Sequence, residues 1–249
     1  YPNPEIRDAM SLGIEYAKKY NADLLLATDP DCDRVGIAVK DSDGKYVLLS
    51  GNETGMLLLD YICSRRNVNG TMPEKPVFLK TIVTIDMAER IAEHYGVITK
   101  NVLTGFKYIG EQIRLFEEQG TYEYLFGFEE SYGCLVGTHS RDKDAVAAVM
   151  ALCEAAVYYR MKGMTLWDQM QNLYRKYGYY KEELHTIVKM GADGLAEIQA
   201  VMEDMRRRPL SSAGGFKTVT VRDYLCDHME LPKSDVLYYE LEDDNWFCI

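Results

Sequence analysis

Three aspartates at alternate positions, Asp29, Asp31 and Asp33, directly follow a short apolar run and stand just before Arg34. Pro30 keeps Asp29 out of the helical region, so the strand expected over the apolar run stops there and turns. Carboxylates that share one loop repel one another unless a divalent cation neutralises them. Mg²⁺ suits this loop because it accepts several carboxylates and keeps sites for water or phosphate oxygen. Arg34 would meet that phosphate with its planar set of N–H donors.

Two other interpretations of the acidic loop differ in how well they fit. A calcium loop of the EF-hand type also begins with alternate aspartates, but it requires Gly at its sixth position and Glu at its twelfth. This chain has Arg34 and Lys40 there, and an apolar strand follows where the EF-hand has a helix. The EF-hand interpretation therefore fails. A solvated acidic turn without a metal stays open at this point, because Asp is common in turns.

Strand-like and helix-like segments alternate along the chain as far as residue 177. Strands are expected at 24–27, 35–39, 46–49, 77–83, 97–102 and 124–128, and helices at 4–19, 52–65, 86–95, 108–118, 144–161 and 165–177. Such alternation indicates βαβ units with helices on the faces of a sheet. After residue 178 a smaller α+β unit is expected, with a helix at 195–207 and strands near Val219, Leu237 and Phe247.

The sequence indicates an N-cap for one of these helices and a role in the core for another. Asn52 is a suitable N-cap for the helix that follows it. The helix at 144–161 is rich in apolar residues, and we interpret it as a core helix without a chemical role. Its apolar residues include Val146, Val149, Met150, Cys153 and Val157.

Three more motifs follow the acidic loop: Thr-Gly-Phe-Lys at 104–107, Gly-Phe-Glu-Glu-Ser-Tyr-Gly at 127–133, and Arg-Asp-Lys-Asp at 141–144. The first two come after the carboxyl ends of expected strands, where open α/β sheets bind ligands. In this order, and over about half of the chain, the four motifs resemble those of the α-D-phosphohexomutases. The most similar branch is the bacterial phosphoglucomutase/phosphomannomutase type.

The resemblance implies a metal site and two catalytic residues. Asp29, Asp31 and Asp33 would bind Mg²⁺ together with a phosphoserine oxygen. Arg34 would lie beside the transferred phosphoryl group, and Lys143 is a candidate proton carrier.

The resemblance also implies a sugar site around the second and third motifs. Glu129 and Ser131 would hold sugar hydroxyls. Because neighbours on a strand point to opposite sides, we expect Glu130 to make a structural contact instead. The residues assigned to substrate binding are Thr104, Gly105, Lys107, Glu129, Ser131 and His139.

The implied activity is the Mg²⁺-dependent interconversion of hexose 1-phosphate and hexose 6-phosphate, through a phosphoserine enzyme and a 1,6-bisphosphate. Glucose 1,6-bisphosphate would be the activator. The implied fold is a set of mixed-sheet layered α/β domains of the phosphohexomutase type, followed by part of a smaller α+β domain. The expected segments are 1–50 (the end of domain 2, with the metal loop), 51–178 (domain 3, with the sugar loop) and 186–249 (the start of domain 4).

Two motifs of the family do not occur in this chain: the Thr-Ala-Ser-His-Asn-Pro type segment with the catalytic serine, and the Arg-Pro-Ser-Gly-Thr-Glu-Pro phosphate loop. We therefore expect an interior fragment that is inactive alone. One alternative is an Mg²⁺-dependent sugar-phosphate phosphohydrolase with Asp29 as nucleophile, although Asp33 breaks the usual Asp-x-Asp-x-Thr pattern. Another is a non-catalytic fragment that binds sugar phosphate. The sequence does not fix the preferred sugar or the oligomeric state.

Charge and composition narrow the class of partner. The net charge of −11 argues against nucleic acid, whose phosphates require basic patches. A hexose phosphate must then be met by local cations such as Arg34, Lys107 and Lys143. The apolar runs are too short for a membrane span. None of the six cysteines forms a Cys-x-x-Cys pair, so a reduced cytoplasm is the expected compartment.

Overall fold

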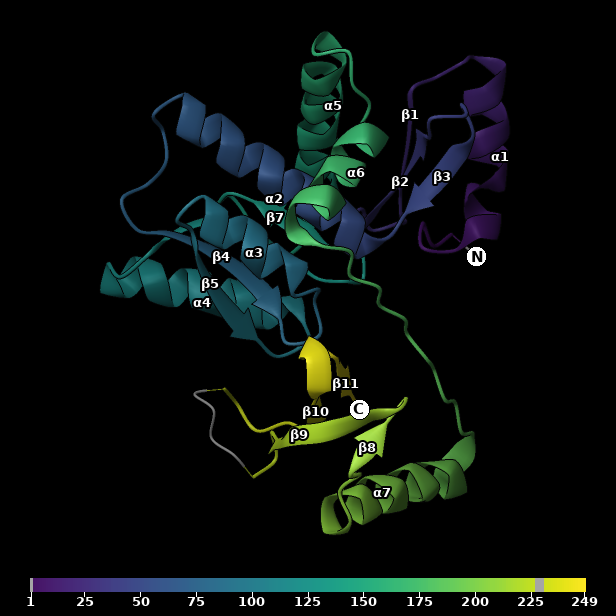
Figure 1. Ribbon diagram of the computed structural model, residues 1–249, viewed down its shortest axis with the longest axis vertical. Helices are drawn as coiled ribbons and strands as arrows, with labels where there is room; N and C mark the ends of the chain where they lie inside the picture. Colours follow the sequence, from purple (N-terminus) through teal and green to yellow (C-terminus); the bar gives the residue numbers. More distant parts are fainter. Residues whose placement is uncertain (1, 227–230) are drawn as a thin grey trace. The chain divides into compact units, whose positions relative to one another are not determined.

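The computed structural model describes residues 2–226 and 231–249, which form two units, 1–181 and 182–249 (Figure 1). Residue 1 and residues 227–230, which belong to the first and third expected segments, lie outside the described residues. The mixed-sheet layered α/β architecture expected for the first unit is confirmed, and so is the smaller α+β unit after it.

A small antiparallel sheet comes first in the chain. Its elements are α1 (Arg7–Lys19), β1 (Leu24–Thr28), β2 (Val35–Lys40) and β3 (Tyr46–Leu49), with strand order β1-β2-β3. Alternate residues of β2 serve different cores, as the pleat of a strand requires. Val35 and Ile37 pack into the main core of the unit, whereas Ala38 packs against Ala17 of α1. Val35 and Ile37 thereby attach β2, and the loop that precedes it, to the core beneath the larger sheet.

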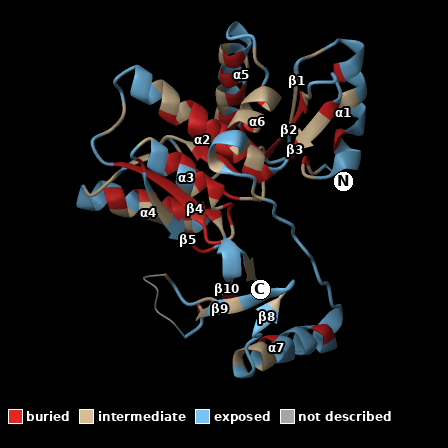
Figure 2. Ribbon diagram, viewed as in Figure 1, coloured by how far each residue is buried: buried red, intermediate tan, exposed pale blue. Residues whose placement is uncertain are grey.

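The larger sheet has the order β5-β4-β6-β7, in which only β7 is antiparallel. Its strands are β4 (Pro76–Thr81), β5 (Ile98–Val102), β6 (Glu123–Phe128) and β7 (Cys134–Val136), and its helices are α2 (Gly51–Val68), α3 (Met87–His94), α4 (Phe106–Gln119), α5 (Ala145–Met161) and α6 (Leu166–Tyr177). Val77 and Leu79 face α4, and Phe78 faces the cluster that contains the other four helices. The sheet is therefore covered on both faces, and β4 is buried throughout (red in Figure 2).

The N-cap predicted for α2 is wrong. The N-cap of α2 is Ser50, whose hydroxyl accepts a hydrogen bond from Glu53 N–H while the Glu53 carboxylate accepts one from Ser50 N–H. Asn52 instead accepts a hydrogen bond from Ile85 N–H at 3.4 Å. A Glu three residues after a Ser forms a reciprocal cap that a lone Asn cannot match.

The interpretation of α5 as a core helix is confirmed. Val146, Met150 and Val157 are more than half exposed, however, and the buried stripe consists mainly of alanines. That stripe consists of Ala145, Ala148, Leu152, Ala155 and Tyr159. A helix that is apolar on nearly all sides has no periodic contrast, so its sequence does not show which stripe packs. The alanines allow close approach to the sheet.

The second unit is an antiparallel sheet with one helix. Its elements are α7 (Gly191–Arg207), β8 (Ser212–Ala213), β9 (Phe216–Asp223), β10 (Leu237–Leu241), the 3₁₀ turn η1 (Glu242–Asp244) and β11 (Trp246–Cys248). The strand order is β11-β10-β9-β8. Met202 of α7 packs against Leu237, Tyr239 and Leu241 of β10. The predicted helix and the three predicted strands of this unit are present.

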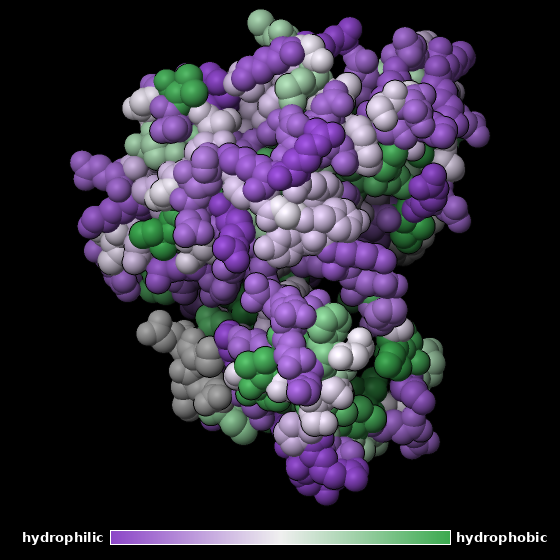
Figure 3. All heavy atoms as spheres, viewed as in Figure 1, coloured by the Kyte–Doolittle hydropathy of each residue, from purple (hydrophilic) through white to green (hydrophobic). Residues whose placement is uncertain are grey.

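Hydrophilic residues cover most of the face of the first unit shown in Figure 3, and hydrophobic ones form small groups between them. Among the described residues, no helix is both long enough and apolar enough to span a membrane.

Candidate functional site

The three aspartates after β1 meet in one loop. Their ligand oxygens all lie within 4.8 Å of one another. Asp29 anchors the loop, because its Oδ1 accepts hydrogen bonds from the backbone N–H groups of Asp33 at 3.1 Å and Arg34 at 3.0 Å. Cys32 makes the turn with a positive φ of 61°. Oxygen ligands gathered at this spacing are a donor set that fits Mg²⁺.

The protonation of this loop is set by burial and by its cations. Burial raises the pKa of Asp29, but hydrogen bonds from the Arg34 backbone and guanidinium outweigh it and hold the pKa at about 2. Burial and the neighbouring Asp29 raise the pKa of Asp33, and Lys143 opposes them. Asp29 is therefore firmly a carboxylate.

Arg34 is held by the carboxylates of Asp29 and Glu5, and its Nε also lies 3.6 Å from Oδ1 of Asp33. Its Nε lies 2.7 Å from Oδ2 of Asp29, and its Nη1 lies 2.8 Å from Oε1 of Glu5. Glu5 was not singled out in the sequence, because a partner 29 residues away leaves no local signal. The guanidinium is thus fixed beside the metal loop.

Backbone hydrogen bonds join the metal loop to the loop at 127–133. Arg34 and Gly133 form an antiparallel bridge, and Val35 N–H donates to the Tyr132 carbonyl at 3.1 Å. The N–H of Ala145, at the start of α5, donates to the Cys32 carbonyl at 3.1 Å. Three segments far apart in sequence therefore meet at one place.

Glu129 joins two of the predicted sugar-site motifs. It is 4% exposed, and its Oε1 accepts a hydrogen bond from Gly105 N–H at 2.9 Å. Gly105 has a φ of 120°, which favours glycine at this approach. Burial raises the pKa of Glu129, and the Gly105 N–H and the Lys143 ammonium offset this only in part.

Glu130 points to different partners, as the alternation of side chains predicts. Its Oε2 accepts hydrogen bonds from the hydroxyls of Thr81, the last residue of β4, at 3.0 Å and of Thr84, just after β4, at 3.2 Å. The backbone of this loop also lies so close to Gly51 that a Cβ there would be 2.1 Å from the Glu130 carbonyl oxygen. The two threonines and Gly51 are site-shaping residues that the sequence motifs did not indicate, although Thr81 stands at a strand end.

The other predicted site residues are less closely gathered. Lys143 reaches the metal loop, with Nζ 3.2 Å from Oδ2 of Asp33. Nε2 of His139 lies 2.6 Å from Oδ2 of Asp144, which caps α5. The ammonium of Lys107 lies 4.8 Å from the ring centre of Tyr108. Thr104 is exposed and Ser131 is half-buried.

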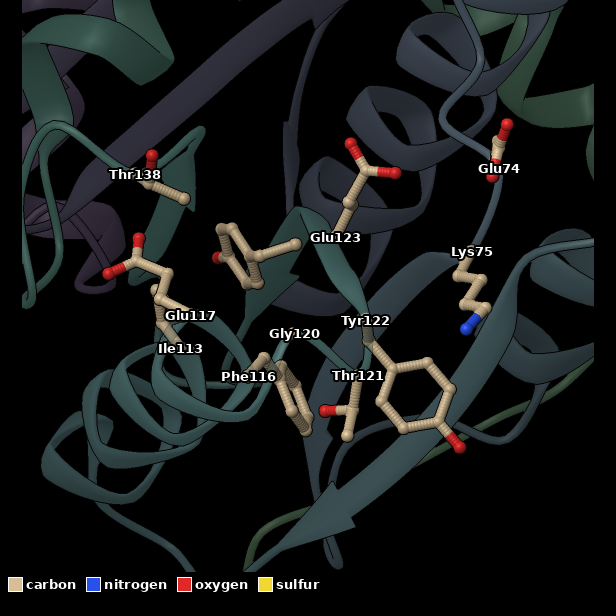
Figure 4. A pocket seen from close by; sticks show the side chains of 11 residues that line it. Glu74, Lys75, Ile113, Phe116, Glu117, Gly120, Thr121, Tyr122, Glu123 and Thr138 are labelled. Atoms are coloured by element: carbon tan, nitrogen blue, oxygen red, sulfur yellow. The ribbon is translucent and has the colours of Figure 1, made fainter.

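A hollow of about 550 Å³ lies at the opposite ends of the strands (Figure 4). Lys75, which precedes β4, and Glu123, the first residue of β6, border this hollow. Phe116 borders it from the last turn of α4. None of the predicted site residues lines it. The candidate site is therefore at the carboxyl ends of the strands and separate from this hollow.

Replacing Glu129 with Gln is expected to stabilise the protein near pH 7.5. The folded pKa of Glu129 lies above its unfolded value, so wild-type stability falls as pH rises from about 4.5 through the folded pKa. Gln keeps an oxygen that accepts from Gly105 N–H but does not bury a negative charge. The difference in unfolding free energy between the variant and wild type should therefore shrink as the pH falls. Urea unfolding of both proteins between pH 4.5 and 8 measures this. A variant that is less stable at pH 7.5 would contradict the buried-carboxylate account.

Two family models match the chain. Residues 50–177 match the model described as phosphoglucomutase/phosphomannomutase, alpha/beta/alpha domain III. Residues 1–44 match the model for alpha/beta/alpha domain II of the same family.

Relatives and solved structures agree with these models. The chain is 36% identical over 222 residues to a phosphoglucomutase of Staphylococcus haemolyticus, covering 89% of this chain and 39% of that protein. For a phosphoglucomutase of Staphylococcus aureus strain MRSA252, identity is 33% over 246 residues, covering 94% and 44%. The chain thus spans about two fifths of the length of these curated relatives.

Among solved structures, the open form of parafusin (a phosphoglucomutase) from Paramecium has a TM-score of 0.63 at 17% identity, covering 100% of this chain and 42% of that one. A phosphoglucomutase/phosphomannomutase family protein from Burkholderia thailandensis has a TM-score of 0.54 at 18% identity, covering 70% and 33%. These two likenesses concern the fold.

Proposed function

The chain belongs to the phosphoglucomutase/phosphomannomutase family, the α-D-phosphohexomutases, and we propose that it supplies the metal loop and sugar loop of such an enzyme. The reaction is the interconversion of hexose 1-phosphate and hexose 6-phosphate, through a phosphoserine enzyme and a 1,6-bisphosphate. The observation that carries the proposal is the joining of the two loops by the bridge between Arg34 and Gly133. This bridge holds a cluster of three carboxylates that could bind a metal next to the loop with the buried carboxylate of Glu129, which we assign to sugar hydroxyls.

Asp29, Asp31 and Asp33 would hold Mg²⁺, whose ligand preference their oxygens fit. When bound, the ion supplies Lewis-acid polarisation of phosphoryl oxygens. Arg34, fixed by Glu5 and Asp29, keeps a positive charge where the phosphoryl group is transferred. Phosphoryl transfer depends mainly on such positioning and charge stabilisation.

Lys143 is the proposed carrier of the proton that leaves the attacking sugar hydroxyl. Burial lowers its pKa, but the hydrogen bond and charge of Asp33, with the charges of Asp142 and Glu129, outweigh burial, so the net pKa is raised. Lys143 is therefore an ammonium in this state and can donate a proton. To accept the hydroxyl proton it must first release one of its own protons and become a neutral amine, and the charges of Asp33, Asp142 and Glu129 oppose that release.

The proposed sugar site lies around Glu129. Its carboxylate is held by Gly105 N–H and keeps further lone pairs for hydroxyls. Ser131 follows Glu129 by two residues in the same loop and is proposed to bind the sugar from the same side. Thr104, Lys107 and His139 are proposed to complete the substrate contacts from the neighbouring loops.

The remaining proposals concern the whole protein. Residues 1–50, 51–178 and 186–249 are proposed as the end of domain 2, domain 3 and the start of domain 4. Glucose 1,6-bisphosphate is the proposed activator, and the cytoplasm is the proposed compartment.

The reaction products test the proposal. A full-length protein that carries this chain is incubated with Mg²⁺, glucose 1-phosphate and a trace of glucose 1,6-bisphosphate, and the products are followed by ³¹P NMR. Glucose 6-phosphate is expected. Free phosphate would instead indicate a phosphohydrolase, and an unchanged substrate would favour a binding protein without turnover on glucose phosphate.

A further inference from the structure

Lys143 is held against the metal loop by its packing on Gly133 and Phe106. Its Nζ lies 3.2 Å from Oδ2 of Asp33, and 18% of its side chain is exposed. The stem passes Gly133 so closely that a Cβ there would lie 2.0 Å from the lysine Cδ. The ammonium lies 5.6 Å from the ring centre of Phe106. An exposed lysine would not be confined in this way.

The two cations at the metal loop are bound differently. Arg34 binds Asp29 through both its side chain and its backbone N–H, binds Glu5 as well, and lies at the longer distance of 3.6 Å from Asp33. Lys143 reaches Asp33 through its ammonium alone. Lys143 is therefore the cation that can leave the loop while the loop keeps its backbone structure.

We propose that Lys143 is an exchangeable counter-ion of the metal loop: its ammonium holds Asp33 in the metal-free protein, and a divalent cation displaces it. This inference rests on the proposed metal site. Before displacement the ammonium already lies 3.4 Å from Oδ1 of Asp142 and is attracted by the charge of Glu129, so these two carboxylates would hold it after it leaves Asp33. Metal binding thus moves a cation from the metal loop towards the proposed sugar site.

Metal affinity of the 249-residue protein tests the exchange, with Mn²⁺ alone as the probe because it also prefers oxygen ligands. Free Mn²⁺ is measured by electron paramagnetic resonance at low ionic strength. Lys143→Met removes the charge and keeps the stem, so Mn²⁺ affinity should rise about tenfold. Lys45→Met is the matched control, since Lys45 pairs with Asp43 at 3.6 Å on an exposed turn. Its affinity should stay within about twofold of wild type.

A second variant pushes the Lys143 side chain away from the metal loop without replacing the lysine. Gly133→Ala puts a methyl group where the Lys143 stem lies, and Gly133 does not have a positive φ, so its backbone accepts alanine. Its affinity should also rise. Circular dichroism identifies any variant that fails to fold, in which case the other variant decides.

The outcomes separate this inference from the proposed function. If wild type binds Mn²⁺ and the folded variants bind it equally or more weakly, the counter-ion role is wrong and the metal site stands. If neither wild type nor the variants bind Mn²⁺, the metal site and the exchange both fail.

Discussion

Replacing Glu129 with Gln in a full-length enzyme that carries this chain should lower kcat/KM for glucose 1-phosphate by about 100-fold or more. Gln keeps the hydrogen bond from Gly105 N–H but loses the negative charge and half of the acceptor capacity that sugar hydroxyls would use. Because the same group serves both orientations of the sugar, kcat and KM should both change. Steady-state kinetics on the purified enzyme measure the effect.

Glu130→Gln is the matched control, with the same chemical change one residue along the chain. Its carboxylate binds the hydroxyls of Thr81 and Thr84 and is turned away from Glu129, so stability should change more than kcat/KM. Thermal melts are recorded alongside the kinetics. If Glu130→Gln loses activity and Glu129→Gln keeps it, our assignment of the loop is wrong by one residue.

Replacing Asp60 with Leu should lower the free energy of unfolding by about 3 kcal/mol or more. Asp60 lies in α2, is 4% exposed, and accepts hydrogen bonds from the hydroxyls of Tyr95 at 2.9 Å and Tyr159 at 3.2 Å and from Gln169 Nε2 at 2.8 Å. It thereby links α2 to α5, to α6 and to the residue that ends α3. Leucine would remove the acceptor of all three donors, of which Tyr159 is buried and Tyr95 and Gln169 are half-buried.

Urea unfolding of the 249-residue protein measures this loss. Asp60→Asn keeps one acceptor oxygen and should cost about 1 kcal/mol, while Asp43→Leu on the exposed turn should change stability by less than about 0.5 kcal/mol. Equal stabilities of Asp60→Leu and Asp43→Leu would mean that the carboxylate does not bind these helices together.

Features set by neighbours along the chain could be predicted from the sequence. The apolar run before Asp29 and the Asp-Pro step fix both the end of β1 and the turn that follows. Glu129 and Glu130 come directly after β6 (Glu123–Phe128), and their side chains take different partners as the alternation expected from a strand predicts. The positions of β9, β10 and β11 were also predicted. The two short strands β7 and β8 were not predicted.

Features set by distant partners could not be predicted. Asp60 binds residues that are 35, 99 and 109 positions away, and no local pattern marks such a set. The position of Lys143 against Asp33 depends on space left by Gly133, which a single sequence does not show. The buried stripe of α5 could not be predicted because apolar residues surround the helix.

Magnesium binding by the 249-residue protein and by its Asp31→Asn variant tests most directly whether the three aspartates form one metal site. Asp31 is the exposed member of the cluster, so removing its charge should leave the fold intact. Calorimetry should detect weak Mg²⁺ binding by wild type and by an Asp43→Asn control, and none by Asp31→Asn. Equal Mg²⁺ affinity of wild type and Asp31→Asn would contradict the metal site.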